Sequence, residues 1–183
     1  MTETVMIQAD AESPERPVRL GSGTALVLAC ALFLVLRVVL RQAPELMEVG
    51  FCAPAAALAA LFLGAARDGL ELTGPGGVRI LVGPACSGVD FFSLLLAATV
   101  WHALRAGRRP AVGWGLALPV LYGVTLAVNA CRITAATEMR VLAGGLLPDR
   151  FLPVLHLTVG AACFLPAFAG IWCLLRRVLP HDL

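Results

Sequence analysis

The chain has little charge and no lysine. Only 14% of its 183 residues are charged and 59% are hydrophobic, whereas soluble domains carry about 25% charged residues. All 14 basic residues are arginine, and the net charge of +2 does not indicate a nucleic-acid partner. The six cysteines form no C-x-x-C pair, so the spacing for a zinc site or a disulfide framework is missing. We expect no metal and no cofactor, and the composition predicts an integral membrane protein in contact with the lipid bilayer.

Apolar runs divide the chain into candidate membrane spans, each of which needs about 20 residues. The five runs cover approximately residues 21–40, 50–66, 89–104, 112–133 and 152–175. This pattern predicts an all-α, multi-pass transmembrane bundle of about five spans, with six as the alternative. The bundle forms one domain, residues 21–183, behind a polar tail, residues 1–20.

The polar segments between the runs predict two further features. Glu71–Thr73 and Val78–Val82 flank a glycine-rich turn, which indicates a small outer hairpin between spans two and three. Residues 134–150 are mixed in character, and we expect a connector with room for a short interfacial helix.

Arginine near the ends of the runs predicts the orientation in the cytoplasmic (inner) membrane. Positive charge favours the cytoplasmic side, which assigns that side to Arg105, Arg108 and Arg109 and to the C-terminal Arg176-Arg177 pair. Counting five alternating spans then places Arg37 and Arg41 in the cytoplasm as well. The same count brings the outer ends of spans three, four and five to the extracytoplasmic face.

Cys86 lies just before the third run, in a segment that resembles a turn. Ser87 can cap the helix that follows, with Asp90 three residues later completing a capping box. Cys86 would then lie beside a helix N-terminus, whose partial positive charge favours an anionic nucleophile. A structural thiol in a tight turn is the alternative interpretation.

Arg132 and His156 fall at the outer ends of the fourth and fifth runs. A guanidinium at this depth needs a carboxylate, carbonyl groups or water. Arg132 either extends to the membrane–water interface or stabilises an oxygen that becomes negative during acyl transfer. Asn129, one turn before Arg132, is placed to orient the substrate or the arginine. His156 is either a satisfied core histidine or a general base.

These residues together resemble a known family. Ala85-Cys86-Ser87-Gly88 opening a helix, Asn129-Ala130-Cys131-Arg132 closing one, and His156 followed by Gly160 are similar to the exosortase/archaeosortase family, of which the chain resembles a short, single-domain member. The resemblance covers about residues 70–175.

The resemblance implies a membrane cysteine peptidase or transpeptidase of the sortase type, a thiol protease in protein sorting. Its partners would be secreted proteins with a C-terminal sorting signal, cleaved through a thioester on Cys86. Arg132 would stabilise the oxyanion and His156 would move the proton, with Asn129 and Ser87 in substrate-binding or orienting roles. The alternatives are a membrane thiol oxidoreductase and a non-catalytic assembly protein. No oligomeric state is predicted.

Overall fold

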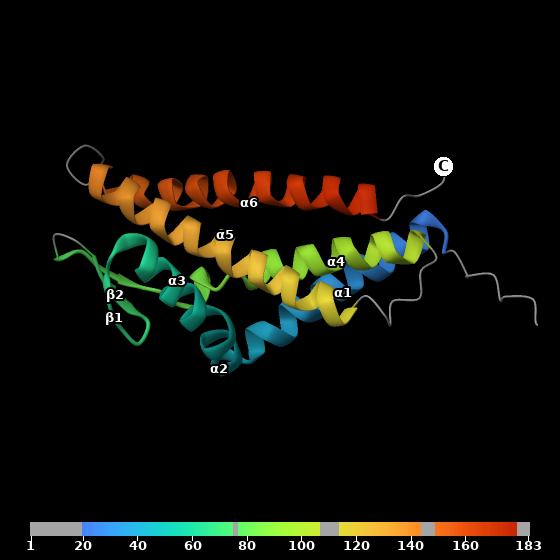
Figure 1. Ribbon diagram of the computed structural model, residues 1–183, viewed down its shortest axis with the longest axis horizontal. Coiled ribbons are helices and arrows are strands. Elements are labelled where there is room, and N and C mark those ends of the chain that lie inside the picture. Colours follow the sequence, from blue (N-terminus) through green and yellow to red (C-terminus); the bar gives the residue numbers. More distant parts are fainter. Residues whose placement is uncertain (1–19, 75–76, 107–113, 144–148, 179–183) are drawn as a thin grey trace, which may run out of the picture.

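The computed structural model describes residues 20–74, 77–106, 114–143 and 149–178, and most of these residues are helical. Figure 1 shows the elements in chain order: α1 (Ser22–Gln42), α2 (Pro44–Met47), the π-helix η1 (Glu48–Cys52), α3 (Ala53–Leu63), β1 (Ala66–Asp68), β2 (Glu71–Thr73), β3 (Arg79–Leu81), the 3₁₀-helix η3 (Pro84–Cys86), α4 (Val89–Arg105), α5 (Trp114–Ala143), the 3₁₀-helix η5 (Asp149–Phe151) and α6 (Leu152–Val178).

Five helical segments among the described residues are long and apolar enough to cross a membrane, which confirms the expected all-α, multi-pass class. They are Ser22–Gln42, Pro44–Leu63, Pro84–Arg105, Gly115–Leu142 and Pro153–Val178. Residues 1–19 of the polar tail, together with Arg108 and Arg109, lie outside the described residues.

The second segment begins earlier than the apolar pattern indicated. Pro44 occupies the first turn of α2, where its fixed φ suits a helix start and its missing N–H costs nothing. The helix then continues through η1 into α3 and stops at Gly64, whose φ is +59°. Glycine adopts this left-handed conformation without strain, so the chain can leave the helix there.

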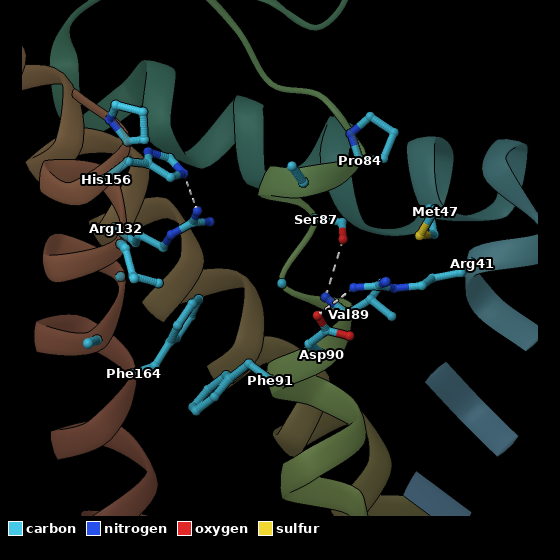
Figure 2. A pocket seen from close by; sticks show the side chains of 16 residues that line it. Arg41, Met47, Pro84, Ser87, Val89, Asp90, Phe91, Arg132, His156 and Phe164 are labelled. Atoms are coloured by element: carbon cyan, nitrogen blue, oxygen red, sulfur yellow. Dashed lines mark hydrogen bonds and ion pairs between the residues drawn. The ribbon is translucent and has the colours of Figure 1, made fainter. Parts of the chain in front are cut away.

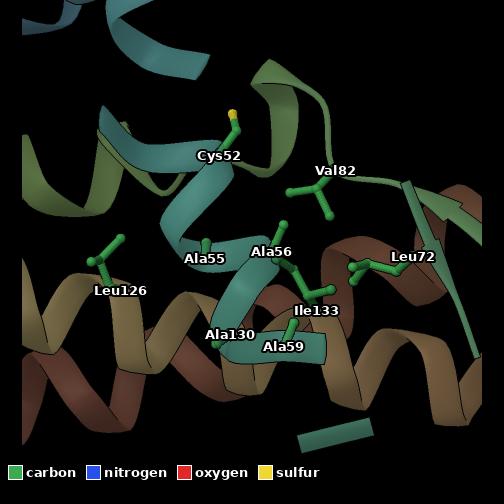
Figure 3. Close-up of a cluster of buried hydrophobic side chains, with 9 residues drawn as sticks. All are labelled: Cys52, Ala55, Ala56, Ala59, Leu72, Val82, Leu126, Ala130 and Ile133. Atoms are coloured by element: carbon green, nitrogen blue, oxygen red, sulfur yellow. The ribbon is translucent and has the colours of Figure 1, made fainter. Parts of the chain in front are cut away.

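The expected hairpin between the second and third spans is present. Strands β2 and β3 pair antiparallel, with Leu72 opposite Ile80. Strand β1 adds a third strand on the other side of β2, with Arg67 opposite Leu72. The side chain of Leu72 is fully buried and packs into a cluster beneath α3, so the small sheet covers this end of the bundle (Figure 3).

The helices form two groups along the length of α5. One group packs α3 against the second half of α5, through Ala55 and Ala59 on one side and Ala130 on the other (Figure 3). Alanine at these positions allows the two helix backbones to approach closely. The other group packs Phe91 and Leu95 of α4 against the first half of α5. Helices α3 and α4 therefore lie at different positions along α5 (Figure 1).

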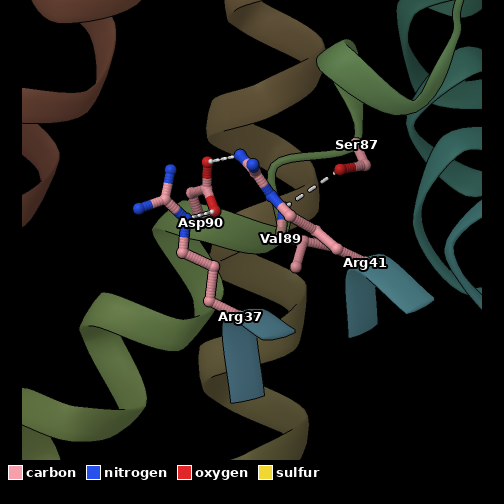
Figure 4. A network of polar contacts seen from close by, with 5 residues as sticks. All are labelled: Arg37, Arg41, Ser87, Val89 and Asp90. Carbon is pink, nitrogen blue, oxygen red and sulfur yellow. Dashed lines mark hydrogen bonds and ion pairs between the residues drawn. The ribbon is translucent and has the colours of Figure 1, made fainter. Parts of the chain in front are cut away.

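Helix α1 runs antiparallel to α4, and this corrects the predicted side of two arginines. Arg37 Nε and Arg41 Nη2 each lie 3.0 Å from the carboxylate of Asp90, at the start of α4 (Figure 4). Arg105 lies at the opposite end of the same helix. The prediction that Arg37 and Arg41 share a side with Arg105 is wrong, because α1 and α3 follow one another along the molecule without the expected reversal.

Helix α5 also differs from expectation. It continues to Ala143, so the predicted connector over residues 134–150 is wrong for the first ten of those residues. Thr137 lies on a buried face of this extension and donates a hydrogen bond to the Ile133 carbonyl at 2.8 Å. The cluster between α3 and α5 reaches Ile133, immediately before these extra turns.

The antiparallel α1–α4 pair predicts a labelling pattern. We expect a maleimide that cannot cross membranes to label Gln42→Cys and Ala106→Cys from opposite sides of sealed vesicles, because these positions lie at opposite ends of the pair. Arg177→Cys, at the basic end of α6, should be labelled from the same side as Ala106→Cys. Labelling of positions 42 and 106 from the same side, identified on digested peptides, would contradict this arrangement.

Candidate active site

A cavity of about 990 Å³ lies where the two groups of helices meet. Figure 2 shows its walls: the start of α4 with the end of α1 on one side, and α6 with the middle of α5 on the other. Its lining contains Arg41 and Asp90 on the first side and Arg132 and His156 on the second. Phe164 lines its deeper part together with other apolar side chains. The cavity is thus an apolar pocket with a few convergent polar groups, the usual form of a binding site.

Arg132 is the buried cation of this cavity, with only 7% of its surface exposed. Nη1 donates a hydrogen bond to Asn129 Oδ1 at 3.2 Å, and Nη2 lies 2.5 Å from His156 Nε2 (Figure 2). Nε is buried and has no hydrogen-bond partner within the described part of the chain. The guanidinium therefore enters the cavity with donor capacity to spare.

The surroundings of Arg132 are otherwise apolar. Its Cζ lies 5.5 Å from the ring centroid of Phe164, a cation–π contact that partly compensates the charge. Gly160 lets α6 pass directly over the side chain, since a Cβ there would lie 3.3 Å from Arg132 Nε. No carboxylate forms an ion pair with Arg132 among the residues described. Such an arginine costs roughly 2.5–3.5 kcal/mol at the centre of a membrane helix.

His156 projects from the second turn of α6 and is exposed toward the cavity. A guanidinium can only donate, so His156 Nε2 accepts from Arg132 and the ring is neutral, with its proton on Nδ1. This places a potential proton acceptor directly beside the cation. His102, by contrast, is buried near the far end of α4, so it lies away from this site as expected.

Asn129 joins Arg132 to the segment that contains Cys86. Its side chain is fully buried, and Nδ2 donates to the Cys86 carbonyl at 2.5 Å while Oδ1 accepts from Arg132. Both ends of the amide are therefore used. Asn129 fixes the guanidinium and the backbone of Cys86 relative to each other.

Ser87 caps α4 in a different way from the predicted capping box. Helix α4 begins at Val89, with Gly88 as its N-cap residue, and Ser87 Oγ accepts the Val89 N–H at 3.3 Å. Asp90 turns away to the arginines of α1. The prediction of Ser87 as N-cap and Asp90 at the third position is wrong, because Gly88 adopts a left-handed φ of +75° and starts the helix one residue later.

Cys86 is half-buried, and its side chain packs against the cluster between α3 and α5. Its neighbours Pro84, Ala85, Ser87 and Gly88 line the cavity, but Cys86 is not among the lining residues. The structure thus brings Arg132, His156 and the Cys86 backbone together, and it directs the thiol to the opposite face of η3.

Sequence reasoning missed three residues that shape the site. Gly88 provides the turn before α4, Phe164 lies under the guanidinium, and Arg41 lines the cavity from α1. The glycine in Ala-Cys-Ser-Gly was a usable signal for a left-handed turn, whereas Phe164 and Arg41 carry no local signal. Within the described residues, no group of three or more His, Cys, Asp or Glu side chains could hold a metal ion.

Gly88→Ala should destabilise the protein. The left-handed φ of +75° costs a non-glycine residue about 1–2 kcal/mol, and the new Cβ would lie 3.1 Å from Asn129 Cγ. We expect a lower midpoint of thermal unfolding in detergent. Gly83→Ala is the matched control, because Gly83 has a φ of −87° and open space around it. Equal midpoints for the two variants would contradict the role of Gly88.

No protein-family model matches the chain, and no curated protein or solved structure matches it either.

Proposed function

We propose that the protein is a membrane cysteine peptidase or transpeptidase that cleaves C-terminal sorting signals from secreted proteins. The observation that carries this proposal is the buried Arg132 guanidinium, which lines a large cavity beside His156 and has more N–H donors than its contacts to Asn129 and His156 use. A cation held in this way is suited to an oxygen that becomes negative during acyl transfer. The resemblance of Ala85–Gly88 and Asn129–Arg132 to exosortases supports the same reaction.

Helix lengths support a site at the outer boundary of the cytoplasmic membrane. From Val89 to Arg105, α4 rises about 25 Å, and from His156 to Arg176 α6 rises about 30 Å. The hydrocarbon core of a bilayer is also about 30 Å thick. Since the arginine-bearing ends of α4 and α6 lie at the same end of the molecule (Figure 1), assigning that end to the cytoplasm puts the cavity at the extracytoplasmic face.

The proposed reaction begins with attack of the Cys86 sulfur on the scissile carbonyl carbon. The carbonyl oxygen becomes an oxyanion and accepts hydrogen bonds from Arg132. When that oxygen takes the donor now used by His156, Nε2 becomes free to accept the thiol proton. His156 then protonates the leaving amine, the C–N bond breaks and a thioester remains on Cys86. Water or an acceptor nucleophile releases the product by attacking the thioester.

This mechanism requires the Cys86 side chain to turn from the α3 cluster into the cavity. Asn129 holds only the Cys86 carbonyl, so rotation about the side-chain bonds leaves the anchored backbone in place. The cavity begins at the adjacent residues of the same turn. Asn129 and Ser87 act as orienting groups, the first on Arg132 and the second on the start of α4.

The proposal predicts that Cys86→Ala and Arg132→Ala stop processing. The test substrate is a co-expressed secreted protein ending in a short motif, an apolar helix and an arginine cluster. Without the sulfur no thioester forms, and loss of an oxyanion donor slows acyl transfer by about 10²–10³-fold. Processing is followed as the size change of the substrate, with membrane levels of each variant measured in parallel.

Two neighbouring side chains provide matched controls for these variants. Cys131 is exposed and adjoins Arg132, and Arg140 is exposed further along α5. Cys131→Ala and Arg140→Ala should process the substrate at the wild-type rate. Cleavage of the substrate by Cys86→Ala at the wild-type rate would contradict the proposal.

A further inference from the structure

Cys52 is a buried thiol that the proposed reaction does not use. It ends the π-helix η1, and none of its surface is exposed. Figure 3 shows its sulfur directed away from the alanines of α3, toward the chain that follows Val82. That chain leads through Gly83 into η3 and Cys86.

One carbonyl oxygen brings Cys52 and Cys86 together. Gly83 O accepts a hydrogen bond from Cys52 Sγ at 3.6 Å, and the same oxygen accepts the Cys86 N–H at 2.8 Å. The Cys86 side chain packs on the cluster that contains Cys52, and charges on the two sulfurs would interact. Cys52 and the side chain of Cys86 therefore share one cluster, and Cys86 is not among the residues that line the cavity.

Both backbones are anchored around this pair. The Tyr122 hydroxyl donates to Gly50 O within η1, and Asn129 donates to Cys86 O. Residues of η1 are therefore fixed against α5, and so is the turn that carries Cys86. With both backbones held, the disulfide would form by rotation of the two side chains, which lie in the same cluster.

We propose that Cys52 and Cys86 form a reversible disulfide that withdraws the Cys86 thiol from the cavity. This inference rests on the proposed function only for its effect on activity. The oxidant is a low-molecular-weight disulfide, RSSR. One cysteine thiolate attacks RSSR and releases RS⁻, which takes up a proton. The second thiol, losing its proton, displaces the other RS⁻ from the mixed disulfide. Two thiols and RSSR thus give one protein disulfide and two RSH.

The location of the pair favours this chemistry. The proposed orientation puts η1 and η3 at the extracytoplasmic end, and disulfides persist in that compartment. In the disulfide form Cys86 has no thiol or thiolate with which to attack a peptide. Reduction returns the thiol, so the bond acts as a switch on the site.

The test uses the full-length protein in membranes treated with oxidised glutathione. Remaining thiols are blocked with N-ethylmaleimide, and the digested peptides are analysed by mass spectrometry. We expect a linked Cys52–Cys86 peptide pair and loss of Cys86 alkylation, with recovery after dithiothreitol. In Cys52→Ser, and in Cys52→Ala as a second variant, no linked pair can form, and oxidised Cys86 should carry glutathione instead. Oxidised wild type in which Cys86 carries glutathione and no Cys52–Cys86 peptide pair is found would overturn the proposal.

A second thiol pair provides the matched control. Cys131 on α5 and Cys163 on α6 are also free thiols. Cys163→Ser should keep the Cys52–Cys86 linkage after oxidation, whereas Cys52→Ser should lose it and carry glutathione on Cys86. If the linkage forms but the reduced wild type cleaves no sorting signal, the proposed function fails and the disulfide stands. If the reduced enzyme cleaves and no linkage forms, the disulfide fails alone.

Discussion

The position of one guanidinium organises the centre of this protein. Arg132 is buried among apolar helices, where Asn129 and the neutral ring of His156 hold it without a carboxylate in the described residues. Gly160 and Phe164 shape the surface of α6 around it. A buried cation without a counter-ion lowers the stability of the fold. Such a group is expected at a functional site, where a bound anion or a negative charge that develops during a reaction pairs with the cation.

The helix arrangement creates the space that Arg132 faces. Because α3 and α4 pack on different halves of α5, a cavity remains where one group ends and the other begins. The turn from Gly83 to Gly88 crosses this junction, and Gly88 lets it enter α4 in contact with Asn129. One face of the turn borders the cavity and the other carries the Cys52–Cys86 neighbourhood. Rotation of the Cys86 side chain would therefore move its sulfur from one of these two environments to the other.

The sequence predicts the elements of this fold better than their arrangement. Apolar runs locate the spans and alternation with glycine locates the hairpin, since both are local signals. The direction of α1 depends on its contact with α4, where Arg37 and Arg41 meet Asp90, and the close approach of α3 to α5 depends on the alanines between them. Neither contact is visible from one segment alone. For the site, the cost of an arginine in an apolar run identifies Arg132, but the orientation of the Cys86 thiol depends on a three-dimensional turn.

The free energy of unfolding of Arg132→Met tests the central claim most directly, because it needs no substrate. Methionine fills similar space without charge and leaves Asn129 bonded to the Cys86 carbonyl. Asn129 Oδ1 loses its donor, which costs about 1–3 kcal/mol, and removal of the buried charge offsets this cost. If the buried charge of Arg132 destabilises the fold and is kept for its role in the reaction, the variant should unfold in detergent at the same temperature as wild type or at a higher one. Destabilisation by several kcal/mol, as for loss of a structural buried ion pair, would contradict the account.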